Sequence, residues 1–120
     1  MRLLDTDVLV DMRRGFAPAV GWYDSLTEQP GVPGFVAMEL LSGCRDKSDQ
    51  AKLQIFLTEL PIFWLSEANC QRSLEYLRDY RLSINLGIID ALIAATAIGL
   101  GATLCTFNTK HFPAVPGLIT

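Results

Sequence analysis

The sequence predicts a single α/β domain in which helices flank a small parallel sheet. The chain has 120 residues, a common size for one globular domain. Half of the residues are hydrophobic and 19% are charged, which favours a full apolar core over disorder. Short apolar runs alternate with longer helical stretches, and this alternation indicates parallel strands joined by right-handed crossovers. We therefore expect one domain over residues 1–120.

Five short apolar runs are expected to form the strands. The first, Arg2 to Asp5, ends in an acidic residue, and the last is expected at an edge of the sheet. Turn-forming residues separate several of these runs from their neighbours. The remaining runs are the segment around Val32, Ile62 to Leu65, Ala102 to Phe107 and, at the edge, Gly117 to Thr120.

Six helices are expected between these strands. Gly15, Pro30 and Gly31 end the first two, Pro61 follows the fourth, and Gly101 turns the chain after the sixth. The predicted ranges run from Thr6 or Asp7 as the N-cap to Arg14, from Pro18 to about Gln29, from Phe35 to Cys44, from Ser48 to Leu60, from Ser66 to about Tyr80, and from Ile88 to Leu100.

The composition argues against a secreted or membrane protein. The most apolar stretch, Ile84 to Leu104, contains Asp90, and an aspartate near the centre of a bilayer costs about 2.5 kcal/mol or more. Asp5 stands too near the start for a signal peptide to precede it. We expect a cytoplasmic protein with no membrane segment. An odd number of scattered cysteines predicts reduced core thiols, and these are Cys44, Cys70 and Cys105.

The net charge of -3 restricts the class of partner without excluding nucleic acid. If three of the 13 acidic residues bind metal, the remaining 10 balance the 10 basic residues. A divalent ion also adds positive charge where a phosphate would lie. Tight nonspecific binding over a broad basic face is disfavoured. A zinc cluster is not expected, because the cysteines are scattered and His111 is the only histidine.

Asp5, Glu39 and Asp90 are the candidate functional acids. Asp5 ends the first strand, and ligands of parallel α/β sheets bind beyond the carboxyl ends of the strands. Asp90 lies near the start of an apolar helix, and Glu39 lies in an apolar stretch with no basic residue at helical spacing before Arg45. The alternatives are a helix cap for Asp5, capping or dipole stabilisation for Asp90, and an exposed or otherwise paired position for Glu39.

A magnesium ion would explain three converging carboxylates. Carboxylates crowded together raise one another's pKa values unless a cation compensates for their charge. Mg2+ prefers oxygen ligands and is commonly held by one or two carboxylates plus a substrate phosphate. One or two such ions can activate a water for attack on phosphorus. The sequence therefore predicts a magnesium site that can activate a water for attack on a phosphate.

Four sequence blocks contain the candidate site residues. They are LLDTDVLVD around Asp5, VAMELLSG around Glu39, GIIDALIAATA around Asp90 and TLCTFNTKHF, which contains Asn108. Each block is weak alone, but the four together span essentially the whole chain and are specific. In this order and spacing they resemble the PIN-domain ribonucleases, specifically the VapC toxins of toxin–antitoxin pairs.

The resemblance implies a fold, an activity and partners. The expected fold is a five-stranded parallel sheet in the order 3-2-1-4-5. The expected activity is an RNA endonuclease that depends on Mg2+ or Mn2+, with Asp5, Glu39 and Asp90 as the acidic metal ligands. The expected partners are RNA, a second copy of the chain in a homodimer, and a VapB-type antitoxin that covers the active site.

Asn108 departs from the pattern, because many relatives carry an aspartate there or three residues later, at the position of His111. Asn108 is expected to support the site as a neutral ligand or water-orienting group, or to act only as a turn former. Thr6 and Asp7 are candidates for supporting the metal ligands. The candidate RNA-facing charges are Arg13, Arg14, Arg45, Lys47 and Lys110.

Two other functions compete with this reading. In a phosphatase of the haloacid-dehalogenase type, Asp5 would be the nucleophile and Asp7 the acid, but the later carboxylate pair of such enzymes has no match near Asn108. A degenerate PIN module would bind RNA or protein without cleaving. For self-association, Trp22, Tyr23 and Phe56 are candidate contacts, with burial inside the monomer as the alternative.

Overall fold

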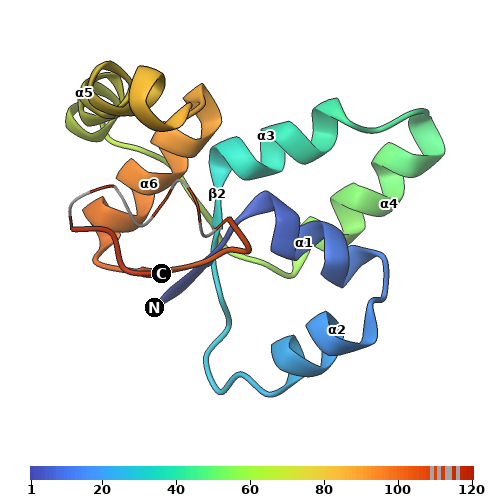
Figure 1. The fold of residues 1–120 in the computed structure, drawn as a ribbon. Coiled ribbons are helices and arrows are strands. Elements are labelled where there is room, and N and C mark those ends of the chain that lie inside the picture. Colours follow the sequence, from blue (N-terminus) through green and yellow to red (C-terminus); the bar gives the residue numbers. More distant parts are fainter. Residues whose placement is uncertain (109, 111, 113–114, 116) are drawn as a thin grey trace.

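The computed structural model describes residues 1–108, 110, 112, 115 and 117–120 (Figure 1). Short strands alternate with helices, so the predicted α/β fold with flanking helices is confirmed. The strands are β1 (Arg2–Leu4), β2 (Val32–Pro33), β3 (Ile62–Phe63) and β4 (Thr103–Cys105). The helices are α1 (Thr6–Arg13), α2 (Ala17–Asp24), α3 (Gly34–Ser42), α4 (Lys47–Thr58), α5 (Glu67–Ile84) and α6 (Ile88–Leu100).

The strands pair in parallel, as predicted. β1 pairs with β4 in a register that places Leu3 opposite Leu104, and β2 pairs with β3. Single parallel bridges join Leu3 to Gly31 and Thr103 to Ile119. The ladders thus form two sheets of two strands each within the described residues. The order 3-2-1-4-5 in one five-stranded sheet stays a prediction.

Most helix ends lie within two residues of the predictions, and three differences have a clear physical cause. Asp5, rather than Thr6 or Asp7, caps α1, because its Oδ1 accepts a hydrogen bond of 2.7 Å from the Thr6 backbone N–H. Helix α2 ends at Asp24, because the polar residues that follow it offer few apolar side chains to the core. Helix α5 continues to Ile84, where Asn85 adopts the left-handed conformation that stops it.

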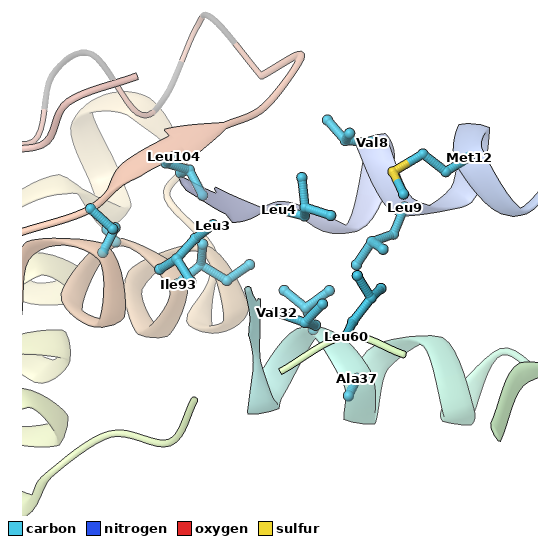
Figure 2. Packing of buried hydrophobic residues seen from close by; sticks show 14 of the residues in the cluster. Leu3, Leu4, Val8, Leu9, Met12, Val32, Ala37, Leu60, Ile93 and Leu104 are labelled. Atoms are coloured by element: carbon cyan, nitrogen blue, oxygen red, sulfur yellow. The ribbon is translucent and has the colours of Figure 1, made fainter. Parts of the chain in front are cut away.

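The hydrophobic core lies between the strands and helices α1, α3 and α6 (Figure 2). Leu3, Leu104 and Val32 are fully buried at its centre, because both faces of β1 and β4 are covered. Further out, the ring of Phe56 is partly buried against this core. Trp22 and Tyr23 are likewise partly buried, which matches the expected burial within the monomer.

The apolar stretch that contains Asp90 forms a buried helix and a strand, as predicted. Helix α6 has five consecutive buried residues, Ile93 to Ala97, and β4 follows it after Gly101. Gly101 has a φ of +62°, a left-handed conformation that glycine adopts without strain. Among the helices of the described residues, none has the length and apolar character needed to cross a membrane.

The cysteines are free thiols, as predicted, but they are not all in the core. Cys44 and Cys105 are partly buried, whereas Cys70 is exposed. The prediction of a core thiol is therefore wrong for Cys70. Helix α5 buries only one face against α6, and most of its residues, Cys70 among them, face solvent.

Candidate active site

Asp5 stands where β1, β4 and α1 meet. Its backbone N–H donates to the carbonyl of Cys105, 3.0 Å away, and its carbonyl accepts the first helical hydrogen bond of α1, from Leu9 at 3.2 Å. The residue is only 6% exposed. The fold therefore fixes the Asp5 backbone from both sides and buries its carboxyl group at the carboxyl end of the central strand.

Burial raises the pKa of the Asp5 carboxyl group from 3.8 to about 6. Removal from water is the largest cause, and the negative charges of Asp7 and Asp90 act in the same direction. Hydrogen bonds from Thr106 and from the Thr6 backbone oppose the rise. The site therefore holds a carboxylate whose charge is only partly compensated by the protein.

Thr106 is a site residue that the sequence analysis missed. Its hydroxyl donates to Oδ2 of Asp5 at 2.6 Å and accepts from the backbone N–H of Asn108 at 2.9 Å. Thr106 thus ties the carboxylate to the segment that contains Asn108. The signal was present in the sequence, because parallel pairing of the two strands places the residue after Cys105 beside Asp5.

Asp7 and Asp90 complete the acidic cluster around Asp5. Asp7 accepts a hydrogen bond of 3.0 Å from the Phe107 backbone N–H through Oδ2, whereas its Oδ1 is buried without a hydrogen-bond partner among the described residues. Burial is the main cause that raises the pKa of Asp7, and the charges of Asp11 and Asp90 add to it. Asp90 lies in the first turn of α6 and acts electrostatically on both Asp5 and Asp7.

Glu39 approaches this cluster from helix α3. Its side chain is exposed, and its Oε1 accepts a hydrogen bond from the Thr6 hydroxyl. Thr6 is also the residue whose backbone N–H binds Asp5. One residue of α1 therefore contacts two of the three predicted metal ligands.

The structure brings the three predicted metal ligands together in two ways. Asp5 and Asp90 interact electrostatically, and Glu39 is linked to Asp5 by Thr6, which donates a hydrogen bond to each of them. No group of three or more histidine, cysteine, aspartate or glutamate side chains among the described residues stands in a metal-binding arrangement. For Asn108 the structure shows the backbone hydrogen bond to Thr106. His111 lies outside the described residues.

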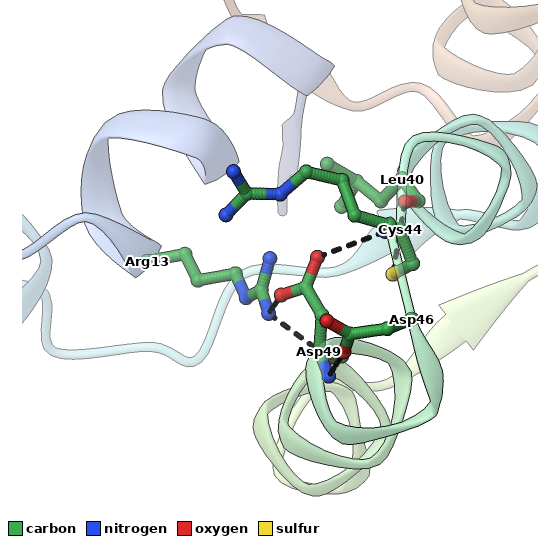
Figure 3. Close-up of polar contacts among 6 residues, drawn as sticks. Arg13, Leu40, Cys44, Asp46 and Asp49 are labelled. Carbon is green, nitrogen blue, oxygen red and sulfur yellow. Dashed lines mark hydrogen bonds and ion pairs between the residues drawn. The ribbon is translucent and has the colours of Figure 1, made fainter.

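The predicted RNA-facing charges lie mainly around α1 and α4. Arg13 forms an ion pair of 2.7 Å with Asp49 and donates to the Asp49 carbonyl at 3.1 Å (Figure 3). This pairing lowers the pKa of Asp49. Four further charges, Arg14, Arg45, Lys47 and Lys110, are exposed.

The chain belongs to the PIN-domain family, because the family model for the PIN domain matches residues 2–118. It is 37% identical to the ribonuclease VapC19 of Mycobacterium tuberculosis, over 98% of this chain and 97% of that protein. It is 30% identical to a ribonuclease VapC of Rickettsia bellii, over 97% of this chain and 91% of that protein. These similarities favour neither the dehalogenase-type phosphatase nor a degenerate PIN module.

Solved structures of toxin–antitoxin complexes have the same fold. VapBC2 from Rickettsia felis, bound to a DNA fragment from its promoter, has a TM-score of 0.82 and 31% identity, covering 98% of this chain and 95% of that one. A toxin–antitoxin complex from Klebsiella pneumoniae has a TM-score of 0.82 and 28% identity, covering 100% and 97%. The PIN-domain α/β fold and the VapC-type family expected from the sequence blocks are therefore confirmed, whereas the order of five strands stays a prediction.

Proposed function

We propose that this protein is a metal-dependent endoribonuclease that acts in the cytoplasm as the toxin of a toxin–antitoxin pair. Asp5, Glu39 and Asp90 would hold the ion, which is Mg2+ or, in its place, Mn2+. One PIN domain over residues 1–120, with five strands in the order 3-2-1-4-5, would carry the site. The similarity to ribonucleases named VapC over nearly the whole chain supports the substrate class.

The buried carboxylate of Asp5 carries the proposal of a metal ion. Its raised pKa reflects burial beside two other acids, and no described ion pair joins a basic side chain to it. Among the described residues, Oδ1 of Asp7 is buried without a hydrogen-bond partner and adds a further carboxylate oxygen beside Asp5. Carboxylate oxygens with no basic partner are the ligands that a hard divalent cation prefers.

The bound ion and the residues around it would have different roles in cleavage of an RNA phosphodiester bond. A bound divalent ion would lower the pKa of a water and offset the charge that develops on the phosphate. Thr106 and the start of α1 keep the Asp5 carboxylate oriented through one hydrogen bond to each oxygen. Thr6 restrains Glu39, and Asp7 holds the chain at Phe107. We propose that Asn108 supports the site as a neutral group.

The test is cleavage of structured RNA by purified protein that carries no antitoxin. We expect cleavage with Mg2+ or Mn2+ and none with EDTA. The variants Asp5→Asn, Glu39→Gln and Asp90→Asn should each lose most activity, because neutral amides compensate a cation poorly. Glu28→Gln, in the exposed segment between α2 and β2, is the matched control and should cleave at the wild-type rate.

Two outcomes would contradict this proposal. One is undiminished cleavage in chelator after contaminating nucleases have been removed. The other is retention of near wild-type rates by two of the three site variants. Circular dichroism of each variant would establish that the fold is intact, so that lost cleavage reports on the site.

An antitoxin is the proposed regulatory partner. The two solved structures described above, from Klebsiella pneumoniae and Rickettsia felis, are complexes of toxins with antitoxins. A short neighbouring reading frame whose product suppresses toxicity on co-expression is the expected result. Expression of the chain alone should stop growth, and expression of Asp90→Asn should not.

A homodimer is also proposed. Exposed apolar side chains on α5 and at the start of α6 support it, because Leu74, Leu82 and Ile88 are 68%, 95% and 65% exposed. Exposed apolar groups of this kind favour association. Light scattering should give the mass of a dimer, and a monomer at micromolar concentration would contradict the proposal.

A further inference from the structure

A basic pocket lies between helices α1, α3 and α4, and its residue Val10 is one helical turn from Thr6, which contacts Glu39. These three helices gather on the same side of the molecule (Figure 1). The pocket has a volume of about 420 Å³, within the range of sites for small molecules. Its lining consists of three apolar and three basic residues, Val10, Leu40, Phe56, Arg13, Arg14 and Lys52.

Helix geometry connects this pocket to the acidic cluster. Thr6, Val10 and Arg14 are four residues apart and lie on one face of α1. Thr6 contacts Glu39 of α3, and Val10 lines the pocket with Leu40, the next residue of α3. At 1.5 Å per residue, the eight positions from Thr6 to Arg14 span about 12 Å along the helix. The pocket therefore continues the face of α1 on which Thr6 contacts Glu39, one of the three proposed metal ligands.

The three positive charges of the pocket are differently paired. Arg13 is held by Asp49, which leaves part of its guanidinium fork available for further hydrogen bonds. Arg14 and Lys52 have no carboxylate within ion-pair distance in the part of the chain that the structure describes. The pocket is therefore positively charged, although the chain as a whole has a net charge of -3.

The apolar half of the pocket adds a second chemical character. Phe56 is one helical turn from Lys52 on α4, so an aromatic ring and an ammonium group occupy the same face. Cations bind phosphate, and an aromatic ring stacks on a nucleotide base. Together these groups match a nucleotide unit of single-stranded RNA.

We propose that this pocket binds the RNA strand next to the cleaved bond, with Arg14 and Lys52 on its phosphates and Phe56 against a base. The inference rests on the proposed function and names the part of the protein that holds its substrate. The favoured occupant is RNA rather than an acidic protein segment, because the face of α1 that lines the pocket leads to Thr6 and its contact with Glu39, one of the acids that would cut the strand.

The test compares two double variants that remove the same charge. Arg14→Gln/Lys52→Gln removes the two pocket cations that form no ion pair among the described residues, and Arg2→Gln/Arg72→Gln removes two exposed cations outside the pocket. With structured RNA as substrate, we expect the pocket variant to raise KM about tenfold, with kcat within about threefold of wild type. The control variant should keep the wild-type KM.

Binding without cleavage provides a second measurement. Asp5→Asn protein in EDTA, with a short fluorescein-labelled single-stranded RNA as probe, should bind with an affinity that falls as salt rises. Loss of two phosphate contacts should reduce the slope of log K against log salt by about 1.4. Phe56→Leu keeps an apolar side chain in the core but removes the ring, and it should weaken binding about fivefold or more.

Unchanged KM, salt slope and RNA affinity in the pocket variant would overturn the proposal. It would also be overturned if the variant lost binding of a labelled deca-glutamate peptide and kept binding of RNA, because the pocket would then fit an acidic protein segment. Failure of the proposed function is distinct, because it would appear as absent metal-dependent cleavage by the wild type. The affinity measurement in EDTA would still decide the role of the pocket.

Discussion

Replacing Asp5 by asparagine should stabilise the protein in the absence of divalent metal while abolishing cleavage. The folded pKa of about 6 exceeds the unfolded value of 3.8. The proton of Asp5 therefore contributes stability that is fully present below about pH 4 and is lost as the pH rises through 6. The difference of 6 - 3.8 = 2.2 pKa units corresponds to about 3 kcal/mol of stability lost by neutral pH.

Asparagine does not titrate, so the Asp5→Asn variant does not lose this stability as the pH rises. Its Oδ1 can still accept from the Thr6 N–H, and its Nδ2 can donate to the Thr106 hydroxyl, which accepts as well as donates. We expect Asp5→Asn to gain about 1–3 kcal/mol near pH 7.5 in EDTA, and little near pH 4. For a domain of this size the gain corresponds to a Tm increase on the order of 5–10 °C.

Thermal unfolding followed by circular dichroism is the assay. Asp79→Asn, which neutralises an exposed carboxylate on α5, is the control and should change stability by less than about 0.5 kcal/mol. Mg2+ at ten times its Kd should stabilise the wild type by about 1.4 kcal/mol and the Asp5 variant much less. A variant no more stable than the wild type at pH 7.5 would refute the reasoning, as would an equal gain at both pH values.

Substitutions at three other positions test separate parts of the site and fold. Thr106→Val should lower the cleavage rate at least tenfold, because Asp5 loses a hydrogen bond. Thr106→Ser keeps the hydroxyl and should recover most of the rate. Equal cleavage rates for both variants would remove Thr106 from the site. Asn108→Asp should tighten Mg2+ binding, and Asn108→Ala should weaken cleavage less than Asp90→Asn does. Magnesium titrations of the cleavage rate with the same RNA check both expectations. An unchanged metal dependence in both variants would make Asn108 a turn former only. Asp46→Ala should cost about 1 kcal/mol in urea unfolding, because Asp46 caps α4 through the Asp49 N–H, and should leave kcat unchanged.

Much of the fold followed from local sequence signals. The range predicted for the sixth helix, Ile88 to Leu100, matches α6, because glycines stand on both sides of a continuous apolar run. The end of α2 was missed, because nothing between Asp24 and Pro30 interrupts a helix by conformation alone. There the loss of contact with the core ends the helix, and such a loss depends on tertiary structure.

Part of the candidate site could also be predicted from the sequence, and part of it could not. Asp5 was identified from its place at the end of a strand, and the structure buries it there. Thr106 was missed, because threonine after a strand is common and its importance comes only from the strand that it faces. The exposure of Glu39 and its contact with Thr6 depend on how α3 crosses α1, which the apolar pattern of α3 did not specify.

The pairing of the first strand with β4 has a consequence for how the protein is made. Asp5 and Thr106 are 101 positions apart, and β1 has Gly31 at one edge but lacks a strand at the other until β4 has been synthesised. Contacts between residues so far apart in the sequence are entropically costly and slow to form. A growing chain shorter than about 106 residues therefore lacks the hydroxyl that orients Asp5. Synthesis must pass Thr106 before the proposed site can be completed.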